Sequence, residues 1–253
     1  MFILFALVMM RMSGAIMFNP LLGRTNYPRP AKGALIFALT LLLYLGVDGQ
    51  LAHEPATMLE FGFMLIKELM VGFALGFSME LAYAVIRFAS AIMDYTMGLS
   101  MAQVYDPQYN TQMTITSGIY YALLSLLFLT TNGHLRMIGL FYTSAELIPF
   151  GEVTLRTEIY QLMLEIFKAN IALGLQLAFP LIAMELVTEA AIGILMRMIP
   201  QINVFSVNFQ MKIIVGLMMM VLLFSPMADK MYVIIDNTFM YMEQLLQLMR
   251  PLG

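Results

Sequence analysis

Charged residues repeatedly interrupt the apolar stretches of this chain. Intervals without a charge cover residues 33–47, 69–79, 107–135, 169–184, 198–211 and 213–228, and only 107–135 exceeds 16 residues. A helix that crosses a bilayer alone needs about 20 mostly apolar residues, and a central ionised group costs about 2.5 to 3.5 kcal/mol. The charges must therefore face protein or water inside an assembly, or the helices must be bent and lie partly outside the hydrocarbon.

Composition places the chain among helical membrane proteins. Hydrophobic residues make up 61% and charged residues 11% of the 253 residues, whereas soluble domains carry about 25% charged residues. This length suits one bundle of about six to eight helical segments. We predict a single all-α, polytopic membrane domain over residues 1–253. Lysine and arginine are too evenly spread to assign an orientation.

Several function classes are excluded by charge and motif content. The net charge is −3 and no basic run occurs, so nucleic-acid binding is not expected. Cysteine is absent, which removes disulfides and thiolate chemistry. HExxH, Walker A, GxSxG and paired-aspartate motifs are all missing, and His53 and His134 lie in turn-like segments. We therefore predict no enzyme activity, no cofactor and no metal site.

Turn-forming residues divide the chain into helical segments. Loops are predicted at 23–33, 46–57, around Asp106-Pro107, at 132–134 and from 149, and another helix is expected to end at Pro200. The first 18 residues are apolar and lack the basic start and cleavage site of a secretory signal. We predict a retained helix there.

Two helical faces combine small residues with acidic ones at four-residue steps. One carries Gly72-xxx-Gly76 between two glutamates, a spacing typical of closely packed membrane helices but also common by chance. For the charged residues of these faces, an ion pair with a neighbouring helix, a proton or ion relay and exposure to water all stay open. The candidate buried charges are Glu68, Glu80, Glu185, Glu189 and Arg197.

Residues 102–112 form the least membrane-like stretch, with two tyrosines, three glutamines, one asparagine and a single charge. Asp106-Pro107 predicts a turn, and the tyrosines add bulk. The amide side chains are suited to meeting water. A wet, turn-forming loop between apolar segments is expected here.

Four segments together resemble the FliR family, whose members are membrane subunits of the flagellar type III export gate. The segments are KELMVGFALGFSMELAYAVIR (67–87), GLSMAQVYDPQ (98–108), LFLTTNGHLRMIGLFYTSAELIPFG (127–151) and MRMIPQINVFSVNFQMKIIVG (196–216). Each is weak alone, but their combination is specific. The resemblance runs from about residue 19 to residue 226, and the N-terminus is shorter than is usual in the family.

This resemblance implies an architecture and a set of partners. The chain is expected to be a fusion of a FliP-like part, about 1–130, and a part that contains a FliQ-like hairpin, about 131–253. Its bent helical hairpins would join FliP-like and FliQ-like subunits in a helical assembly lifted from the bacterial inner membrane toward the periplasm, in the flagellar basal body. An FlhB-like subunit would wrap the entrance. Membrane lipid and secreted flagellar proteins in transit would be its other contacts.

The resemblance also implies roles for two sets of residues. The first would plug and gate the pore, although a water-exposed connector without a gating role stays open: Gln103, Val104, Tyr105, Asp106, Pro107, Gln108, Tyr109, Asn110 and Gln112. The second would serve packing and assembly: Gly72, Gly76, Asn132, Gly133, His134, Pro149, Gly151, Pro200, Gln201, Asn203 and Phe205.

The expected function is to form and close a channel for unfolded rod, hook and filament proteins. One alternative is the homologous subunit of a virulence injectisome. Another is a small-solute transporter that uses Glu185 and Glu189. The chain shows no inverted repeat, which counts against the transporter.

Overall fold

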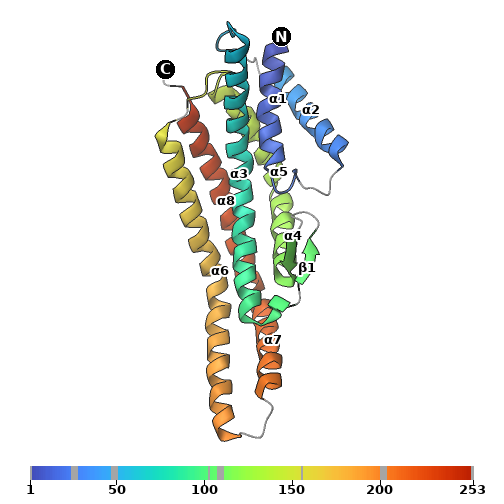
Figure 1. Cartoon of the computed structure of the whole chain (residues 1–253), viewed down its shortest axis with the longest axis vertical. Coiled ribbons are helices and arrows are strands. Elements are labelled where there is room, and N and C mark those ends of the chain that lie inside the picture. Colours follow the sequence, from blue (N-terminus) through green and yellow to red (C-terminus); the bar gives the residue numbers. More distant parts are fainter. Residues whose placement is uncertain are drawn as a thin grey trace. The chain divides into compact units, whose positions relative to one another are not determined.

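The computed structural model of this chain is helical almost throughout (Figure 1). It describes residues 2–23, 28–46, 51–101, 103–106, 111–154, 156–199 and 204–251, with the backbone alone described at 101, 103–106, 111–113 and 204–206. The α-helices are α1 (Phe2–Met17), α2 (Arg29–Gly46), α3 (Met58–Thr96), α4 (Ile115–Thr130), α5 (Gly133–Leu147), α6 (Thr157–Met198), α7 (Val204–Leu222) and α8 (Phe224–Met249). The helical fold class is confirmed.

In the described residues, the elements other than α-helices lie between α3 and α4. A 3₁₀ turn, η1 (Leu99–Met101), precedes strands β1 (Gln103–Asp106) and β2 (Thr111–Thr114). The two strands pair antiparallel, with Gln103 opposite Thr114 and Asp106 opposite Thr111. The all-α prediction therefore needs one addition, a short β-hairpin.

Helix starts follow local capping chemistry. Thr57 accepts a hydrogen bond from the Glu60 N–H, and the Glu60 carboxylate accepts one from the N–H of Ala56, one residue before the N-cap, so α3 begins with a variant of the capping box. The loop predicted over 23–33 ends earlier than expected, because α2 already begins at Arg29. Proline is tolerated there, since a first-turn N–H has no helical partner to lose. Pro30 therefore opens a helix where a loop was predicted.

The described residues divide into two compact units, each assembled from separate parts of the chain. Unit 1 comprises residues 1–82, 128–168 and 235–253. It contains α1, α2, α5 and one end each of α3, α6 and α8. Its buried core includes Leu7 and Ile16 of α1, Leu75 of α3 and Phe141 of α5. Helices α1 and α2 lie side by side in it (Figure 1).

Unit 2 comprises residues 83–127 and 169–234. It holds the hairpin, most of α4, all of α7 and the remaining parts of α3, α6 and α8. Tyr83 and Tyr121 pack with ring centroids 4.8 Å apart, and Leu124 and Leu181 are fully buried. The two units do not test the predicted boundary near residue 130 between a FliP-like and a FliQ-like part. That boundary stays a prediction.

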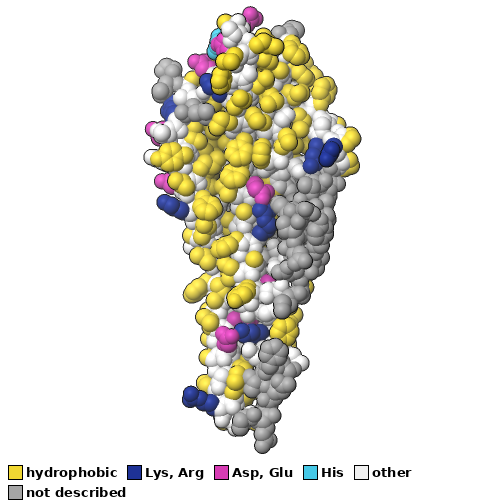
Figure 2. All heavy atoms as spheres, viewed as in Figure 1, with side chains coloured by type: hydrophobic (Ala, Val, Ile, Leu, Met, Phe, Trp, Pro, Cys, Tyr) yellow, Lys and Arg dark blue, Asp and Glu magenta, His cyan; other side chains and the backbone are white. Residues whose placement is uncertain are grey.

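Three helices in the described part of the chain are long and apolar enough to cross a membrane: α2, α3 and α6. Two broken pairs, α4 with α5 and α7 with α8, raise the number to five if each pair acts as one span. Because these helices exceed the charge-free intervals, their charged groups need protein or water partners. Hydrophobic side chains dominate the face shown in Figure 2, which has the view of Figure 1.

Candidate functional site

The β1–β2 hairpin occupies the stretch where a wet loop was predicted. Its strands contain Gln103, Val104, Tyr105 and Asp106 on one side and Gln112 on the other. The pairing brings Tyr105 opposite Gln112. The tip residues of the predicted plug, Pro107, Gln108, Tyr109 and Asn110, lie outside the described residues.

A buried carboxylate ties the hairpin's two ends together. Asp94, near the end of α3, is fully buried and accepts hydrogen bonds from the N–H and the hydroxyl of Thr116 in the first turn of α4. An acceptor at a helix N-terminus satisfies an otherwise free N–H and is favoured by the helix dipole. Thr116 also contacts the Met220 sulfur at 3.7 Å. The end of α3 and the start of α4, on either side of the hairpin, are therefore joined.

Gly98 supplies the turn that leads from α3 into the hairpin. Its φ of +77° lies in the left-handed region that disfavours side chains. A Cβ at this position would also approach the Phe209 ring to 3.3 Å. Glycine is thus needed both for the backbone turn and for the close contact with α7.

A second cluster, in unit 1, joins three segments around a buried ion pair. Arg11 and Glu68 are 0% exposed, and the Arg11 Nε donates to Glu68 Oε2 at 2.6 Å. The Arg11 Nη1 and Nη2 donate to the carbonyls of Ser144 and Ile148 at 2.6 and 3.1 Å. The guanidinium lies 4.2 Å from the Phe150 ring centroid. We call this group the Arg11 cluster. It connects α1, α3 and the end of α5.

The other Glu68 oxygen contacts the turn that contains Pro149 and Gly151, two of the predicted packing residues. Glu68 Oε1 accepts a hydrogen bond of 2.8 Å from the Gly151 N–H. Gly151 has φ +95°, and a Cβ there would lie 2.8 Å from the Met64 methyl group. Pro149 immediately precedes this turn and is half-buried. The sequence motif therefore forms the backbone turn that completes the Glu68 environment.

The predicted glycine pair packs against α1. A Cβ on Gly72 would overlap the Arg11 carbonyl oxygen and lie 2.8 Å from the Ala15 nitrogen. A Cβ on Gly76 would lie 2.8 Å from the Ala15 carbonyl oxygen, and Gly14 approaches Leu69 in the same way. Backbones this close require glycine at the crossing. The crossing also brings Arg11 to Glu68.

The Asn-Gly-His segment separates α4 from α5 as predicted. Asn132 has φ 58°, which asparagine tolerates better than most residues, and α5 begins at Gly133. A Cβ on Gly133 would lie 2.5 Å from the Phe128 ring. His134 is half-buried, and its Nδ1 has no hydrogen-bond partner within the described part.

Comparison with known proteins gives a decisive match. The family model for bacterial export proteins, family 1, covers residues 2–238. The flagellar biosynthetic protein FliR of Escherichia coli K12 is 31% identical over 221 residues, which are 87% of this chain and 84% of that protein. This chain belongs to the FliR family.

Two further members of the FliR family show similar coverage. The FliR protein of Bacillus subtilis 168 is 28% identical over 244 residues, 93% of this chain and 90% of that protein. The FliR protein of Caulobacter vibrioides is 28% identical over 225 residues, 88% of this chain and 89% of that protein. The similarity therefore includes both structural units.

The predicted buried charges of this FliR-family chain differ in environment. Glu68 and Glu185 are buried and Glu80 is half-buried. Glu189 is 51% exposed and pairs with Lys212 on α7 at 2.6 Å, and Arg197 is also exposed. The prediction that Glu189 and Arg197 are buried is therefore wrong within this chain. Both lie in the last ten residues of α6.

Glu185 is the anomalous acid of this set. It is 3% exposed, and neither carboxylate oxygen has a hydrogen-bond partner among the described residues. It lies against Gly216, where a Cβ would come 3.1 Å from Glu185 Oε1 and overlap the Met97 side chain. A buried carboxyl without donors destabilises the folded chain.

The remaining predicted assembly residues lie at the connection between α6 and α7. Pro200, Gln201 and Asn203 lie outside the described residues, and Phe205 has only its backbone described, in the first turn of α7. Sequence reasoning missed Arg11 and Asp94 as the organising charged groups. Their partners are 57 and 22 positions away, so no local spacing reveals them.

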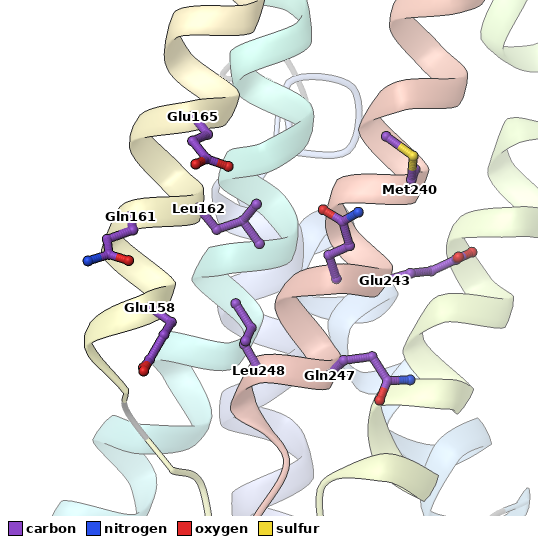
Figure 3. A pocket seen from close by; sticks show the side chains of 9 residues that line it. Glu158, Gln161, Leu162, Glu165, Met240, Glu243, Gln247 and Leu248 are labelled. Carbon is purple, nitrogen blue, oxygen red and sulfur yellow. The ribbon is translucent and has the colours of Figure 1, made fainter.

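A polar groove of about 670 Å³ runs between α6 and α8 in unit 1. Figure 3 shows Glu158, Gln161, Leu162 and Glu165 on α6, with Met240, Glu243, Gln247 and Leu248 on α8. The three glutamates are exposed, and within the described chain none is in an ion pair. Carboxylates are costly in hydrocarbon. This side of α6 is therefore suited to water or a polar partner.

Proposed function

We propose that this membrane protein is a subunit of the flagellar type III export gate and that its β1–β2 hairpin closes the protein-conducting channel. Membership of the FliR family supports the first part, and the relatives described above are flagellar biosynthetic proteins. That naming favours the flagellar apparatus over the injectisome alternative.

The fixed base of the hairpin supports a closing role. Within the described residues, β1 and β2 are the only strands, and they interrupt a helical chain between α3 and α4. Asp94 in α3 accepts two hydrogen bonds from Thr116 in α4, which joins the segments on either side of the hairpin. A paired hairpin on a clamped base holds its position better than an unpaired loop of the same length, because fewer backbone states are available. Such an element is suited to blocking a pore reversibly.

Exposed apolar faces support assembly with other subunits. In unit 2, Phe179, Leu186 and Val187 on α6 and Ile214 and Val221 on α7 are each at least 60% exposed. Large apolar side chains exposed to this extent on two helices favour a protein interface or a lipid-facing side. We propose that FliP-like and FliQ-like subunits cover part of it in the bacterial inner membrane, with an FlhB-like subunit at the entrance. Unfolded flagellar proteins would pass through the resulting channel.

The closing role is tested by deleting residues 106–110 in the co-expressed complex. We expect the complex to assemble and the membrane to become permeable to ions and small solutes, because the tip of the plug is gone. Permeability is measured by ion flux in cells and conductance in planar bilayers. An assembled complex with an unchanged, tight membrane would contradict the plug.

A point variant tests the clamp without shortening the chain. Asp94→Asn removes the charge that accepts both Thr116 hydrogen bonds, which should cost about 1–3 kcal/mol and loosen the hairpin base. We expect intermediate leakage from an intact complex. The matched control is Asp229→Asn, because Asp229 is exposed on α8. Equal permeability in both variants would remove Asp94 from the closing mechanism.

A further inference from the structure

An apolar groove of about 610 Å³ lies between α3 and the first turns of α6, entirely within unit 1. Its floor is formed by the buried side chains of Ala74, Leu81 and Met249. Exposed hydrophobic side chains, including Leu164 and Phe167, form its rim. Unlike a scattered surface hydrophobe, this is a continuous hollow with apolar floor and walls.

The α3 wall of the groove is held in place by aromatic packing. Phe73 and Phe77 stack with ring centroids 5.1 Å apart, and Phe18 packs edge-on against Phe73 at 4.7 Å. Rings held by such contacts are preorganised to receive a ligand. The groove runs from Arg156, directly before α6, to Phe167 on α6, which corresponds to about 16 Å at the helical rise per residue. Its dimensions suit a single extended hydrocarbon chain.

One end of the groove carries a positive charge with an unused donor. Arg156 is half-buried, and its Nη2 donates to the Arg250 carbonyl at 3.1 Å. Its Nε is buried and has no hydrogen-bond partner within the described residues, and no carboxylate there pairs with the guanidinium. Tyr160 lies one turn further along α6 on the same groove. Arginine and tyrosine are the residues that meet lipid headgroups at a membrane interface.

The two sides of α6 differ sharply over the same turns. The side toward α8 carries Glu158 and Glu165 in the polar groove of Figure 3, whereas the side toward α3 is apolar beyond Arg156. One side of α6 suits water or a polar partner, and the other side forms a narrow apolar groove, so neither side is suited to facing bulk hydrocarbon directly. An individually bound amphiphile satisfies both the groove and its charged end.

We propose that the α3–α6 groove binds an acyl chain of an anionic phospholipid, with its phosphate on Arg156. The half-buried guanidinium supplies a charge-assisted hydrogen bond to the phosphate, and the groove covers the chain. This site goes beyond the channel-closing role of the hairpin and does not depend on it. A lipid held there stabilises the packing of α3 against α6 by binding only the folded state.

The test compares two lipids on the complex purified with the full chain. After delipidation in detergent, dioleoyl phosphatidylglycerol or dioleoyl phosphatidylcholine is added, and retained lipid is counted by native mass spectrometry. We expect about tenfold tighter retention of phosphatidylglycerol, as one charge-assisted hydrogen bond allows. Arg156→Gln should abolish this preference. Lys230→Gln, which removes an exposed lysine of unit 2, should leave it unchanged.

A second variant and a cross-link separate lipid from protein as the occupant. Leu164→Asn places a polar group on the exposed rim and should weaken retention of both lipids several-fold without unfolding the chain. A photoreactive residue at position 164 should yield a lipid adduct. Equal retention of both lipids by the parent, a preference that survives Arg156→Gln, or a cross-link to another polypeptide without a lipid adduct would overturn the proposal.

Discussion

Replacing Arg11 with methionine tests whether the Arg11 cluster holds unit 1 together. The substitution keeps an unbranched apolar side chain in the space but removes every donor. Glu68 loses its 2.6 Å partner, and the Ser144 and Ile148 carbonyls lose theirs. The contact with the Phe150 ring is lost as well. A fully buried carboxylate is left with the Gly151 N–H alone.

The expected cost is about 3–5 kcal/mol, because removing one partner of a buried ion pair leaves the other charge desolvated. Arg136→Met is the matched control. Arg136 also pairs with a carboxylate, Asp236 at 2.8 Å, and lies over an aromatic ring, Phe239, but its side chain is 46% exposed. An exposed pair contributes about 0–1 kcal/mol. The two variants therefore differ in burial and in the two backbone carbonyl hydrogen bonds that Arg11 makes.

Stability is measured as the free energy of unfolding in mixed detergent and SDS micelles, followed by the helical circular dichroism signal. The double variant Arg11→Met/Glu68→Leu should recover most of the loss, since apolar side chains can replace a buried ion pair at little cost. Equal losses for Arg11→Met and Arg136→Met would refute the reasoning. A double variant less stable than the single one would refute it too.

Two other substitutions, each with a control on the same helix, test packing and electrostatics by the same unfolding assay. Gly72→Ala should cost about 1–3 kcal/mol because its Cβ would overlap α1, whereas Gly62→Ala, with nothing within 4 Å, should gain about 0.5–1 kcal/mol. A tolerated Gly72→Ala would contradict the close crossing. Glu185→Met should stabilise by about 1–3 kcal/mol by removing an unpartnered buried carboxyl, and Glu189→Met should change stability by less than about 1 kcal/mol. Destabilisation by Glu185→Met would show that Glu185 has a partner in the folded protein.

Most helix breaks were predictable because their signals are local, but the break at Leu223 between α7 and α8 was not predicted. Asn132-Gly133 combines two residues that tolerate positive φ, and the structure separates α4 from α5 there. The predicted ends near residues 46 and 149 follow from glycine and proline in the same way. The start of α2 was missed because Pro30 was taken as a loop residue, although the first turn of a helix accepts proline.

The groups that organise the candidate site depend on contacts distant in sequence. Glu68 was predicted as a buried charge, but its partner Arg11 lies in a helix 57 positions earlier. Residues 103–106 were interpreted as loop because their composition is polar. Their strand character depends on pairing with residues 111–114. A composition-based prediction contains neither contact.

The mass of the particle extracted from membranes in a mild detergent tests the central claim most directly. The claim is that helices with so many charged and exposed apolar groups are completed by other polypeptides. Native mass spectrometry should find this chain only in particles several times heavier than its own 28.5 kDa, with other subunits present. A monodisperse, fully helical particle of 28.5 kDa that holds no other polypeptide would contradict the account.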